Sequence, residues 1–411
     1  MARSMTPART YDVAVVGAGV IGCAVARALA SRCRGRIIVA EKEAGIAFHT
    51  SGRNSGVIHS GFNPKPGTLK AKLCVLGSRM LRQYCRRTAV PMNQVGTVVL
   101  AQNDSEIRTL HELQRRAKLN GVQGVRIIDK NDLKKLEPHA RAVEALVSPT
   151  GAIVDSQALV RRLWRDCLRK GGRFLFNWKL RQIREKSGVL RIKSASGKII
   201  VARFLINCAG LYADSLAHQL GVGLDYRIVP FRGDYFRLTR DRSYLVNSMV
   251  YPTPDLNFPF LGIHLTRTVH GDVIVGPNAS LALGREAYSG RAANPIELLQ
   301  TVVSSQFLRL LSKPEFLRMA GREMWISMVR SRFAAGAQAL VPEIRPEYLE
   351  RGMSGIRAQL VDSKGNLVDD FVSASTEMSF HVLNAVSPGL TCSLAFADMI
   401  VKQLFDKGYL N

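Results

Sequence analysis

Three glycines near the start of the chain have the spacing of a phosphate-binding turn. Gly17, Gly19 and Gly22 follow an apolar run at residues 11–16 and precede an alanine-rich stretch at residues 23–31. In dinucleotide-binding folds the first glycine makes the tight turn, the second lets the pyrophosphate approach the backbone, and the third lets the helix pack on the strand. The N-terminus of that helix would hold the pyrophosphate. The spacing therefore predicts a dinucleotide site.

An acidic residue stands at the distance that such a site requires. A second β-like run at residues 37–40 is followed by Glu41, 19 residues after Gly22. A carboxylate at this place accepts hydrogen bonds from the hydroxyls of the adenosine ribose. NAD and FAD share this first unit, so these residues leave the choice of dinucleotide open.

Small and polar residues follow the acid in a loop at residues 49–61, which reads HTSGRNSGVIHSG. Ser51, Asn54, Ser55 and Gly56 lie in this loop, where small side chains allow the backbone to approach a planar ring. We expect the loop to line the cofactor site. The alternative interpretation is a plain surface loop.

The spacing of apolar residues predicts the elements that position these side chains. Apolar residues recur at helical spacing over residues 69–84, and a buried strand at residues 204–208 runs into Gly210. Parallel strands that end in glycine beside a nucleotide are typical of a doubly wound sheet. We expect a C-terminal helix with Ser387 as its N-cap and Pro388 in its first turn.

Other segments predict a second unit with its own sheet, as the length of 411 residues also indicates. Helices are expected over residues 104–119 and 161–169. Strands are expected at residues 95–100 and 125–128, and antiparallel strands of a second, substrate-facing sheet are expected at residues 233–238, 273–275 and 328–333.

The chain is strongly basic, with 58 Lys and Arg against 32 Asp and Glu. A net charge of +26 favours acidic partners, which include nucleic acid, an anionic bilayer and an anionic substrate. The densest stretch, residues 161–203, lacks interleaved aromatic residues and a nucleic-acid-binding motif, so we interpret it as solvated helix and strand faces. An apolar fraction of 46% excludes disorder, and the uncharged run at residues 13–26 is too short to span a membrane.

Seven scattered cysteines without a C-x-x-C pair indicate buried thiols in a reduced compartment. The first ten residues carry Arg3 and Arg9 and no acid, a composition typical of transit peptides. We therefore expect a mitochondrial location, with the cytoplasm or a membrane periphery as alternatives.

Six motifs, taken in order, carry a resemblance to a known family. The chain resembles the D-amino-acid-oxidase-type flavoproteins, and within them it is most similar to the L-2-hydroxyglutarate dehydrogenases and oxidases. The motifs are GAGVIG at 17–22, SGRNSGVIHSG at 51–61, NCAGLYAD at 207–214, PDLNFPFLGIHLTR at 254–267, SGIRAQLVD at 354–362 and NAVSPGLTCSLA at 384–395. The chain departs from the family pattern at Arg53, where histidine is common, and at Asn63 and Pro64, where two tyrosines are usual.

The resemblance implies FAD rather than NAD and an α/β fold. It implies a Rossmann-like FAD-binding domain assembled from separated segments, plus an antiparallel-sheet α+β substrate domain. We expect the FAD-binding domain at residues 10–90, 145–225 and 350–411, and the substrate domain at residues 91–144 and 226–349. The resemblance also adds the following residues to the expected cofactor contacts: Gly210, Pro388, Gly389, Leu390 and Thr391.

The expected reaction is FAD-dependent oxidation of a 2-hydroxy acid, L-2-hydroxyglutarate to 2-oxoglutarate. A hydride leaves C2 for the flavin N5 while a base removes the hydroxyl proton. His59 is the expected base, because the pKa of histidine lies near working pH, and His264 is the rival. Each has the alternative of a structural role.

Recognition of the substrate carboxylates needs fixed cations. Arg357 lies where related flavoproteins grip an α-carboxylate, and a guanidinium matches a carboxylate bidentately. Lys72 and Arg267 are the candidates for the distal carboxylate, and Gln359 is a further candidate contact; no metal is expected.

Two other functions stay open at this point: a flavin-dependent glycerol-3-phosphate oxidase or dehydrogenase, and a flavoprotein that binds and modifies RNA. For the leading function we expect a small 2-hydroxy dicarboxylate and no nucleic acid. The electron acceptor would be a quinone, an electron-transfer protein or oxygen, and the charge allows peripheral contact with an anionic membrane.

Overall fold

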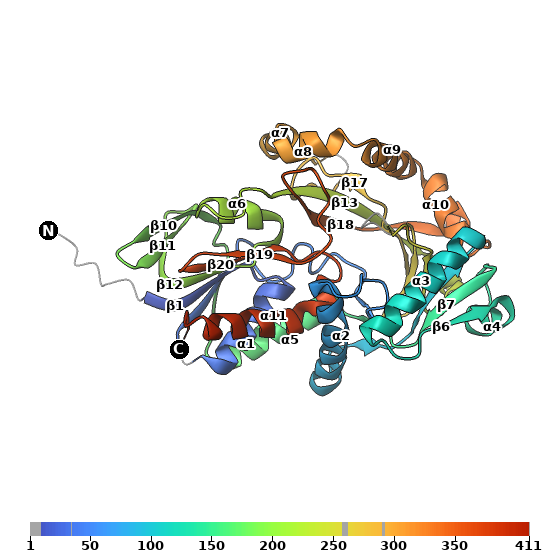
Figure 1. Ribbon diagram of the computed structural model, residues 1–411, viewed down its shortest axis with the longest axis horizontal. Coiled ribbons are helices and arrows are strands. Elements are labelled where there is room, and N and C mark those ends of the chain that lie inside the picture. The colour runs from blue at the N-terminus through green and yellow to red at the C-terminus, as the bar shows by residue number, and fades with distance from the viewer. Residues whose placement is uncertain (1–9, 34, 257–261, 290–291, 411) are drawn as a thin grey trace.

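The chain folds around two large sheets, and it crosses between them several times (Figure 1). The computed structural model describes residues 10–33, 35–256, 262–289 and 292–410. The basic N-terminal stretch at residues 1–9 and the centre of the motif at 254–267, residues 257–261, lie outside the described residues.

The first sheet has a parallel core in which the strands follow the order β20-β12-β1-β2-β9. Its strands are apolar on both faces: Val13 and Val15 pack in one cluster, Ala14 and Val16 in another. Continuous apolar runs are typical of parallel strands covered on both sides. The bounds are β1 Thr10–Val16, β2 Ile37–Ala40, β9 Arg173–Leu175, β12 Ile199–Asn207 and β20 Ser379–Asn384.

Helices cover one face of this sheet and a β-hairpin covers the other. Helix α1 packs between α5 and α11, and α11 also packs on α2. The helices of the first face are α1 Val20–Arg32, α2 Leu69–Thr88, α5 Ser156–Arg169 and α11 Gly389–Asp406. The short helix α6 Ala213–His218 packs on the other face with the hairpin of β10 Leu180–Lys186 and β11 Val189–Ser194, and β19 Val372–Ser375 pairs with β20.

The order β1, α1, β2 confirms the strand, helix and strand that the sequence predicts around the glycine turn. The predicted start of the last helix is wrong by one residue. Pro388 rather than Ser387 is the N-cap of α11, and it makes no side-chain cap hydrogen bond. A turn in which Gly389 N donates to Val386 O (2.9 Å) precedes the helix and delays its start.

The second sheet follows the order β17-β13-β16-β15-β14-β5-β7-β6, and β18 pairs with β13. Its pairs are antiparallel except for β5 and β14, which are parallel. In the long pair, Arg357 lies opposite Phe231. The bounds are β5 Thr97–Ala101, β6 Arg126–Asp129, β7 Glu144–Ser148, β13 Arg227–Leu238, β14 Met249–Pro252, β15 Leu265–Arg267, β16 Val273–Val275, β17 Ser280–Leu281 and β18 Leu349–Val361.

Alternate side chains of β5 enter different clusters, as the pleat requires: Val99 packs with α3 (Asp104–Asn120), and Val98 packs with α10 (Arg330–Gln338). The strand predicted at residues 328–333 is wrong. This segment ends α9 (Pro314–Met328) and begins α10, because Phe333, Ala334 and Ala337 bury one face at helical spacing.

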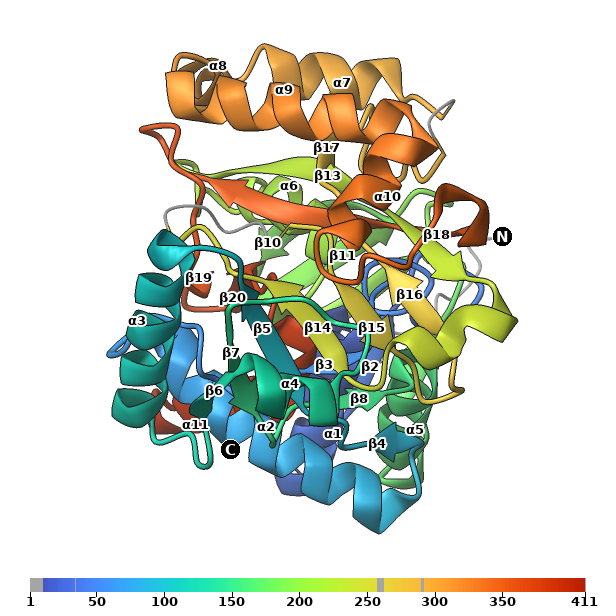
Figure 2. The same ribbon diagram turned by 90° about the vertical axis from the view of Figure 1, so that its right-hand side faces the viewer.

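Helices α7 (Pro295–Val302), α8 (Ser305–Leu311) and α9 form an outer layer over β13, β17 and β18 (Figure 2). The sequence pattern did not predict these three helices. The remaining elements are α4 Lys130–Leu136, the 3₁₀ turns Gly210–Tyr212, Arg240–Leu245 and Pro346–Tyr348, and a small sheet of β3 Val57–Ile58, β4 Met92–Asn93 and β8 Ala152–Val154.

The pairing of β18 concerns the domain boundaries expected from the sequence. Those boundaries remain a prediction. The segment predicted to return to the FAD-binding domain, residues 350–411, starts with most of β18, and β18 pairs in the second sheet. Within the described residues, no helix is both long and apolar enough to span a membrane.

Candidate functional site

A cavity of about 740 Å³ takes its walls from both sheets. Gly17 and Glu41 contribute to it at the ends of β1 and β2, and Tyr251 and Arg357 contribute from β14 and β18. The switch region of a parallel sheet thus faces a second sheet that carries polar side chains, which is the usual place for a ligand in such folds.

The glycine turn brings the N-terminus of α1 to this cavity. Gly17 has a φ of +99°, and a Cβ atom there would lie 2.5 Å from Cys208 O. A Cβ on Gly22 would lie 1.9 Å from Gly17 O, so Gly22 permits helix packing and does not line the cavity. Gly19 lines the cavity, and its Cβ would meet Ser51 Oγ at 2.9 Å.

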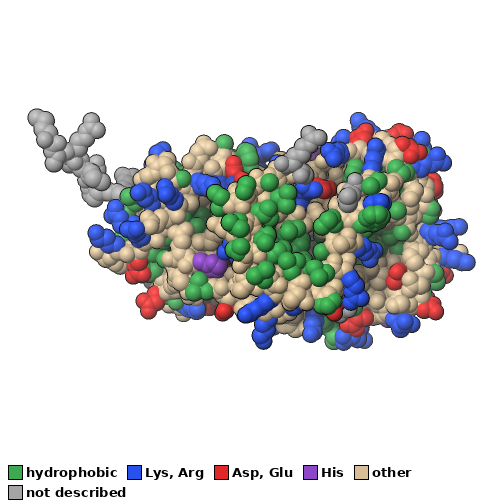
Figure 3. Space-filling model, turned by 90° about the horizontal axis from the view of Figure 1, so that it is seen from above, with side chains coloured by type: hydrophobic (Ala, Val, Ile, Leu, Met, Phe, Trp, Pro, Cys, Tyr) green, Lys and Arg blue, Asp and Glu red, His purple; other side chains and the backbone are tan. Residues whose placement is uncertain are grey.

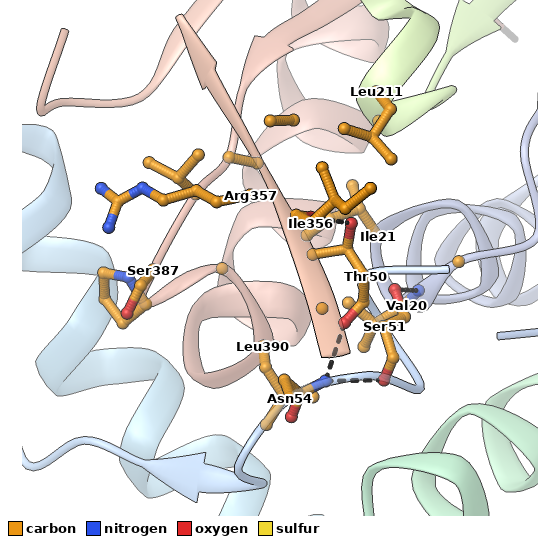
Figure 4. Close-up of a pocket in the computed structure, with 18 of the residues that line it drawn as sticks. Val20, Ile21, Thr50, Ser51, Asn54, Leu211, Ile356, Arg357, Ser387 and Leu390 are labelled. Atoms are coloured by element: carbon orange, nitrogen blue, oxygen red, sulfur yellow. Dashed lines mark hydrogen bonds between the residues drawn. The ribbon is translucent and has the colours of Figure 1, made fainter. Parts of the chain in front are cut away.

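The Gly/Ser/Asn loop is tied to both α1 and β18 (Figure 4). Ser51 Oγ accepts from Val20 N (2.9 Å), and Thr50 Oγ1 donates to Ile356 O (2.9 Å). Asn54 Nδ2 donates to the carbonyls of Thr50 and Ser51 (2.9 and 2.8 Å). Ser51, Asn54 and Ser55 line the cavity, so the loop forms its wall as expected.

Glu41 is 8% exposed and lines the cavity. Its two carboxylate oxygens accept from Ala18 N (2.7 Å) and Glu43 N (2.9 Å). A carboxylate oxygen has more than one lone pair, so this anchored group remains able to accept from a ribose hydroxyl.

The other predicted cofactor contacts divide into two groups. Gly210, Pro388, Gly389 and Leu390 line the cavity, the last three at the N-terminal end of α11. Gly56 and Thr391 do not line it. A Cβ on Gly56 would lie 2.2 Å from Val154 O, so this glycine serves close packing.

Thr391 fixes the loop that carries His59. Thr391 Oγ1 accepts from His59 N (3.0 Å) and donates to Val57 O (3.3 Å). The start of α11 therefore positions His59 through the backbone.

The described residues fit FAD. The cavity runs from the glycine turn and Glu41, which suit a pyrophosphate and a ribose, to the N-terminal end of α11, whose positive dipole suits the charge of a reduced flavin.

His59 and His264 both line the cavity. Burial, then the charges of His264 and Lys70, lowers the pKa of His59 to about 4. Burial also lowers the pKa of His264 to about 4. His264 Nδ1 lies 3.0 Å from Gly262 O, which leaves Nε2 as the acceptor, whereas the His59 ring has no hydrogen-bond partner among the described residues.

Arg357 lies on β18 and lines the cavity, with its Nε donating to Gln359 Oε1 (2.9 Å). Burial lowers the pKa of Arg357 to about 10, so the guanidinium stays charged at neutral pH. Gln359 is fully buried, does not line the cavity, and donates through Nε2 to Leu360 O and Val368 O. It positions Arg357 and is not placed to contact a ligand.

Lys72 and Arg267 are not brought to the cavity. Lys72 is exposed on α2, and Arg267 donates to the carbonyls of Ser243 and Val246 (3.2 and 2.9 Å). The structure places Lys70 and Arg116 in the wall instead.

A signal for Lys70 exists in the sequence. Lys70, Cys74 and Gly77 are spaced four and three residues apart on α2, so they share a helix face, and Cys74 and Gly77 are buried. Lys72 falls outside that face.

The departures from the family pattern lie in the cavity wall. Arg53 stacks over Tyr288, with Cζ 4.2 Å from the ring centroid, and Asn63 O accepts from Arg116 (3.1 Å). Asn63 and Pro64 also line the cavity.

Glu43, His49 and Glu286 form the group with metal-ligand spacing among the described residues. The ammonium of Lys42 already lies among them, 2.6 Å from Glu286 Oε1 and in contact with Glu43. Its hydrogen bond lowers the pKa of Glu43. An ammonium group therefore already lies between the two carboxylates.

A family model described as FAD dependent oxidoreductase matches residues 12–403. "L-2-hydroxyglutarate dehydrogenase, mitochondrial" of Caenorhabditis elegans is 38% identical over 97% of this chain and 94% of its own length. "L-2-hydroxyglutarate dehydrogenase" of Indibacter alkaliphilus is 36% identical over 95% of this chain and 98% of its own.

Among solved structures, FAD-bound L-alpha-glycerophosphate oxidase from Mycoplasma pneumoniae superposes with a TM-score of 0.79. It is 24% identical and covers 97% of this chain and 95% of its own. At that identity the likeness establishes a shared fold.

Proposed function

The chain belongs to the family of FAD-dependent oxidoreductases, and on that premise we propose that it oxidises L-2-hydroxyglutarate to 2-oxoglutarate. FAD, when bound, supplies the acceptor for the hydride that leaves C2. The observation that carries the proposal is the meeting of Arg357, His59 and Lys70 in one cavity with the glycine turn. Two cations and a neutral base match a dicarboxylate that carries a hydroxyl group.

Arg357 is the proposed partner of the C1 carboxylate. Its charge lies on a side chain fixed by Gln359 at the middle of a long strand pair. A planar guanidinium held in one orientation presents two parallel N–H groups to a carboxylate. This contact would set the orientation of C2.

His59 is the proposed base that takes the proton of the C2 hydroxyl. Its low pKa keeps the ring neutral at working pH, so a nitrogen lone pair is available to accept that proton. His264, whose Nε2 is also an acceptor, is the second candidate.

Lys70 is the proposed partner of the distal carboxylate, in place of Lys72 and Arg267. Its Nζ lies 2.6 Å from Asp369 Oδ1, and its charge acts on the pKa of His59, so it lies near the base. Arg116 lines the same cavity and is likewise paired, with Glu112 (2.9 Å), but of these two cations only Lys70 acts on the pKa of His59. The distal carboxylate of the substrate would bind the same ammonium group of Lys70 that Asp369 binds.

The experiment that tests the function is anaerobic mixing of the yellow holoenzyme with a panel of reductants. L-2-hydroxyglutarate is expected to abolish the absorbance of oxidised flavin fastest, and D-2-hydroxyglutarate, lactate, glycine and glycerol 3-phosphate to do so slowly or not at all. Faster reduction by glycerol 3-phosphate would support the alternative that the fold of the Mycoplasma pneumoniae enzyme raises.

The reduced enzyme needs an electron acceptor. A quinone, an electron-transfer protein and oxygen are the alternatives, and peroxide formation in air-saturated buffer separates oxygen from the other two. We propose peripheral contact with an anionic membrane, which would place the chain beside membrane quinones.

We also propose a mitochondrial location, with the cytoplasm or a membrane surface as alternatives that cell fractionation separates. The Caenorhabditis elegans relative is named as a mitochondrial enzyme, and the Indibacter alkaliphilus relative is not.

A further inference from the structure

The outer helices α7–α9 carry a large apolar surface (Figure 3). Among the described residues, twelve large apolar side chains are at least 50% exposed, and seven of these lie between residues 296 and 325. We call these seven the outer apolar face: Ile296, Leu299, Val303, Leu308, Leu317, Met324 and Trp325. Apolar patches of this kind mark contact sites with lipid or protein.

The inner side of the same helices is well packed. Phe307, Leu310 and Phe316 are buried in one cluster with Val229 and Phe231 of β13. The layer is therefore apolar on two sides: the fold buries one side, and the other side is left exposed. The exposure of the outer side does not result from loosely attached helices.

The charged residues around the outer apolar face are mainly basic. Residues 295–332 contain six Lys and Arg and three Glu. Glu297 Oε2 accepts from Arg285 N (2.7 Å) and Glu323 Oε2 accepts from Ala279 N (2.9 Å), so both carboxylates are engaged by the fold. Glu315 is the acid that stays exposed there, and Figure 3 shows basic side chains on both sides of the apolar area.

Trp325 has the surroundings of a residue at a water–lipid boundary. Arg332 Cζ lies 3.2 Å from the centroid of its ring, and Arg332 Nη1 donates to Trp325 O (3.3 Å). An aromatic ring at an apolar surface, next to a basic group, is typical of membrane interfaces.

We propose that the outer apolar face inserts into the surface of an anionic phospholipid bilayer. The inference names the surface for the membrane contact proposed above and does not depend on the identity of the substrate. A second copy of the chain is a poorer occupant, because pairing two such faces would bring their basic rims together in a chain of net charge +26. Helices that lie side by side in one layer suit insertion parallel to the membrane plane.

Co-sedimentation of the holoenzyme with vesicles tests the proposal. We expect binding to vesicles that contain phosphatidylglycerol, weaker binding at high salt, and little binding to pure phosphatidylcholine. Trp325 is the exposed one of three tryptophans, so its emission should shift to shorter wavelength on binding. Trp325→Phe should abolish that shift.

A matched pair of variants separates insertion from simple charge attraction. Leu299→Asp introduces an acid into the outer apolar face, whereas Leu119→Asp introduces it at an equally exposed helical leucine on α3 (62% and 59% exposed). Leu299→Asp should weaken vesicle binding by about tenfold or more, and Leu119→Asp should weaken it little. Turnover of both variants with a dissolved dye as acceptor should match the wild type, because neither residue lines the cavity.

Equal vesicle binding by the two variants would overturn the proposal, because charge alone would then explain the binding. A wild-type dimer that Leu299→Asp converts to a monomer, with no vesicle binding, would assign the face to a second copy. Failure of the substrate panel would leave vesicle binding unaffected, so the two proposals fail separately.

Discussion

His59 is held in its neutral form by its surroundings. Burial removes the ring from water, and the charges of His264 and Lys70 act in the same direction, so its pKa falls to about 4. A neutral imidazole without a protein hydrogen-bond partner among the described residues is ready to accept a substrate proton.

His59→Gln is expected to slow flavin reduction by about 10²–10⁴-fold, because a general base typically contributes that much. In the wild type the rate should fall as the pH drops through the pKa of the base, and this acidic limb should be lost in the variant. Stopped-flow measurement of flavin reduction at several pH values checks both expectations.

His264→Gln is the control for this experiment. It keeps His59 and should retain the acidic limb. A loss below about tenfold in His59→Gln, with the limb intact, would assign the proton transfer to another group.

Lys70→Met should raise the KM for L-2-hydroxyglutarate by about 10–100-fold, since a charge-assisted hydrogen bond contributes about 1.5–3 kcal/mol. Lys72→Met is the matched control, because Lys72 is exposed on the same helix and does not line the cavity. Steady-state kinetics with a dissolved dye would measure both. Equal effects in the two variants would remove Lys70 from the site.

Arg357→Lys should impair turnover much more than folding, because an ammonium cannot reproduce the planar two-pronged contact with a carboxylate. Turnover and thermal unfolding of the variant are measured side by side. Wild-type kinetics combined with a lower melting temperature would give Arg357 a structural role.

At the scale of elements, the turn between β1 and α1 is the part on which cofactor binding depends. Gly19→Val should give protein without FAD, because the new side chain would enter the cavity and meet Ser51 Oγ, which caps Val20 N. Absorbance of the purified protein reports FAD occupancy.

Gly321→Val is the control for Gly19→Val. A Cβ at Gly321 meets nothing within 4 Å, so this variant should purify yellow. Full FAD occupancy in Gly19→Val would contradict the placement of the pyrophosphate at the turn.

Elements with a strong local pattern were predictable from the sequence. The strand, turn, helix and strand at residues 10–40 has continuous apolar runs interrupted by glycines, and the structure confirms it. The outer helices were not predictable in the same way, because apolar residues on both of their sides remove the contrast that marks an amphipathic helix.

The candidate site residues also fall into those that the sequence located and those that it did not. Arg357 and His59 stand in motifs, and the structure brings them to one cavity. The distal cation was misplaced because two lysines, Lys70 and Lys72, lie two residues apart on a helix whose phase decides which one turns inward.

At the scale of the whole molecule, three histidines with lowered pKa values make stability depend on pH: His264 and His381 are buried, and His59 is half-buried. Burial lowers the pKa of His59, His264 and His381 to about 4. The unfolded chain therefore binds more protons than the folded chain as the pH falls below about 6.5, and stability is lost from there down to about pH 4. Burial raises the pKa of Glu137 and Glu323, which act in the opposite sense.

The melting temperature of the holoenzyme should fall as the pH is lowered from 7 to 5. This pH range lies above the usual pKa values of carboxyl groups. Each histidine contributes up to about 2 kcal/mol at pH 5. Thermal unfolding at several pH values in this range checks the expectation. A melting temperature that stays constant or rises towards pH 5 would show that these rings are not held neutral by the fold.

The proposed reaction is tested most directly by a single anaerobic turnover with L-2-hydroxyglutarate. The enzyme should form one 2-oxoglutarate for each FAD that loses its oxidised absorbance, and a deuterium atom at C2 should slow that loss. The D-isomer should leave the flavin oxidised over the same time. Flavin that stays oxidised with the L-isomer, or that is reduced without formation of 2-oxoglutarate, would contradict the proposed function.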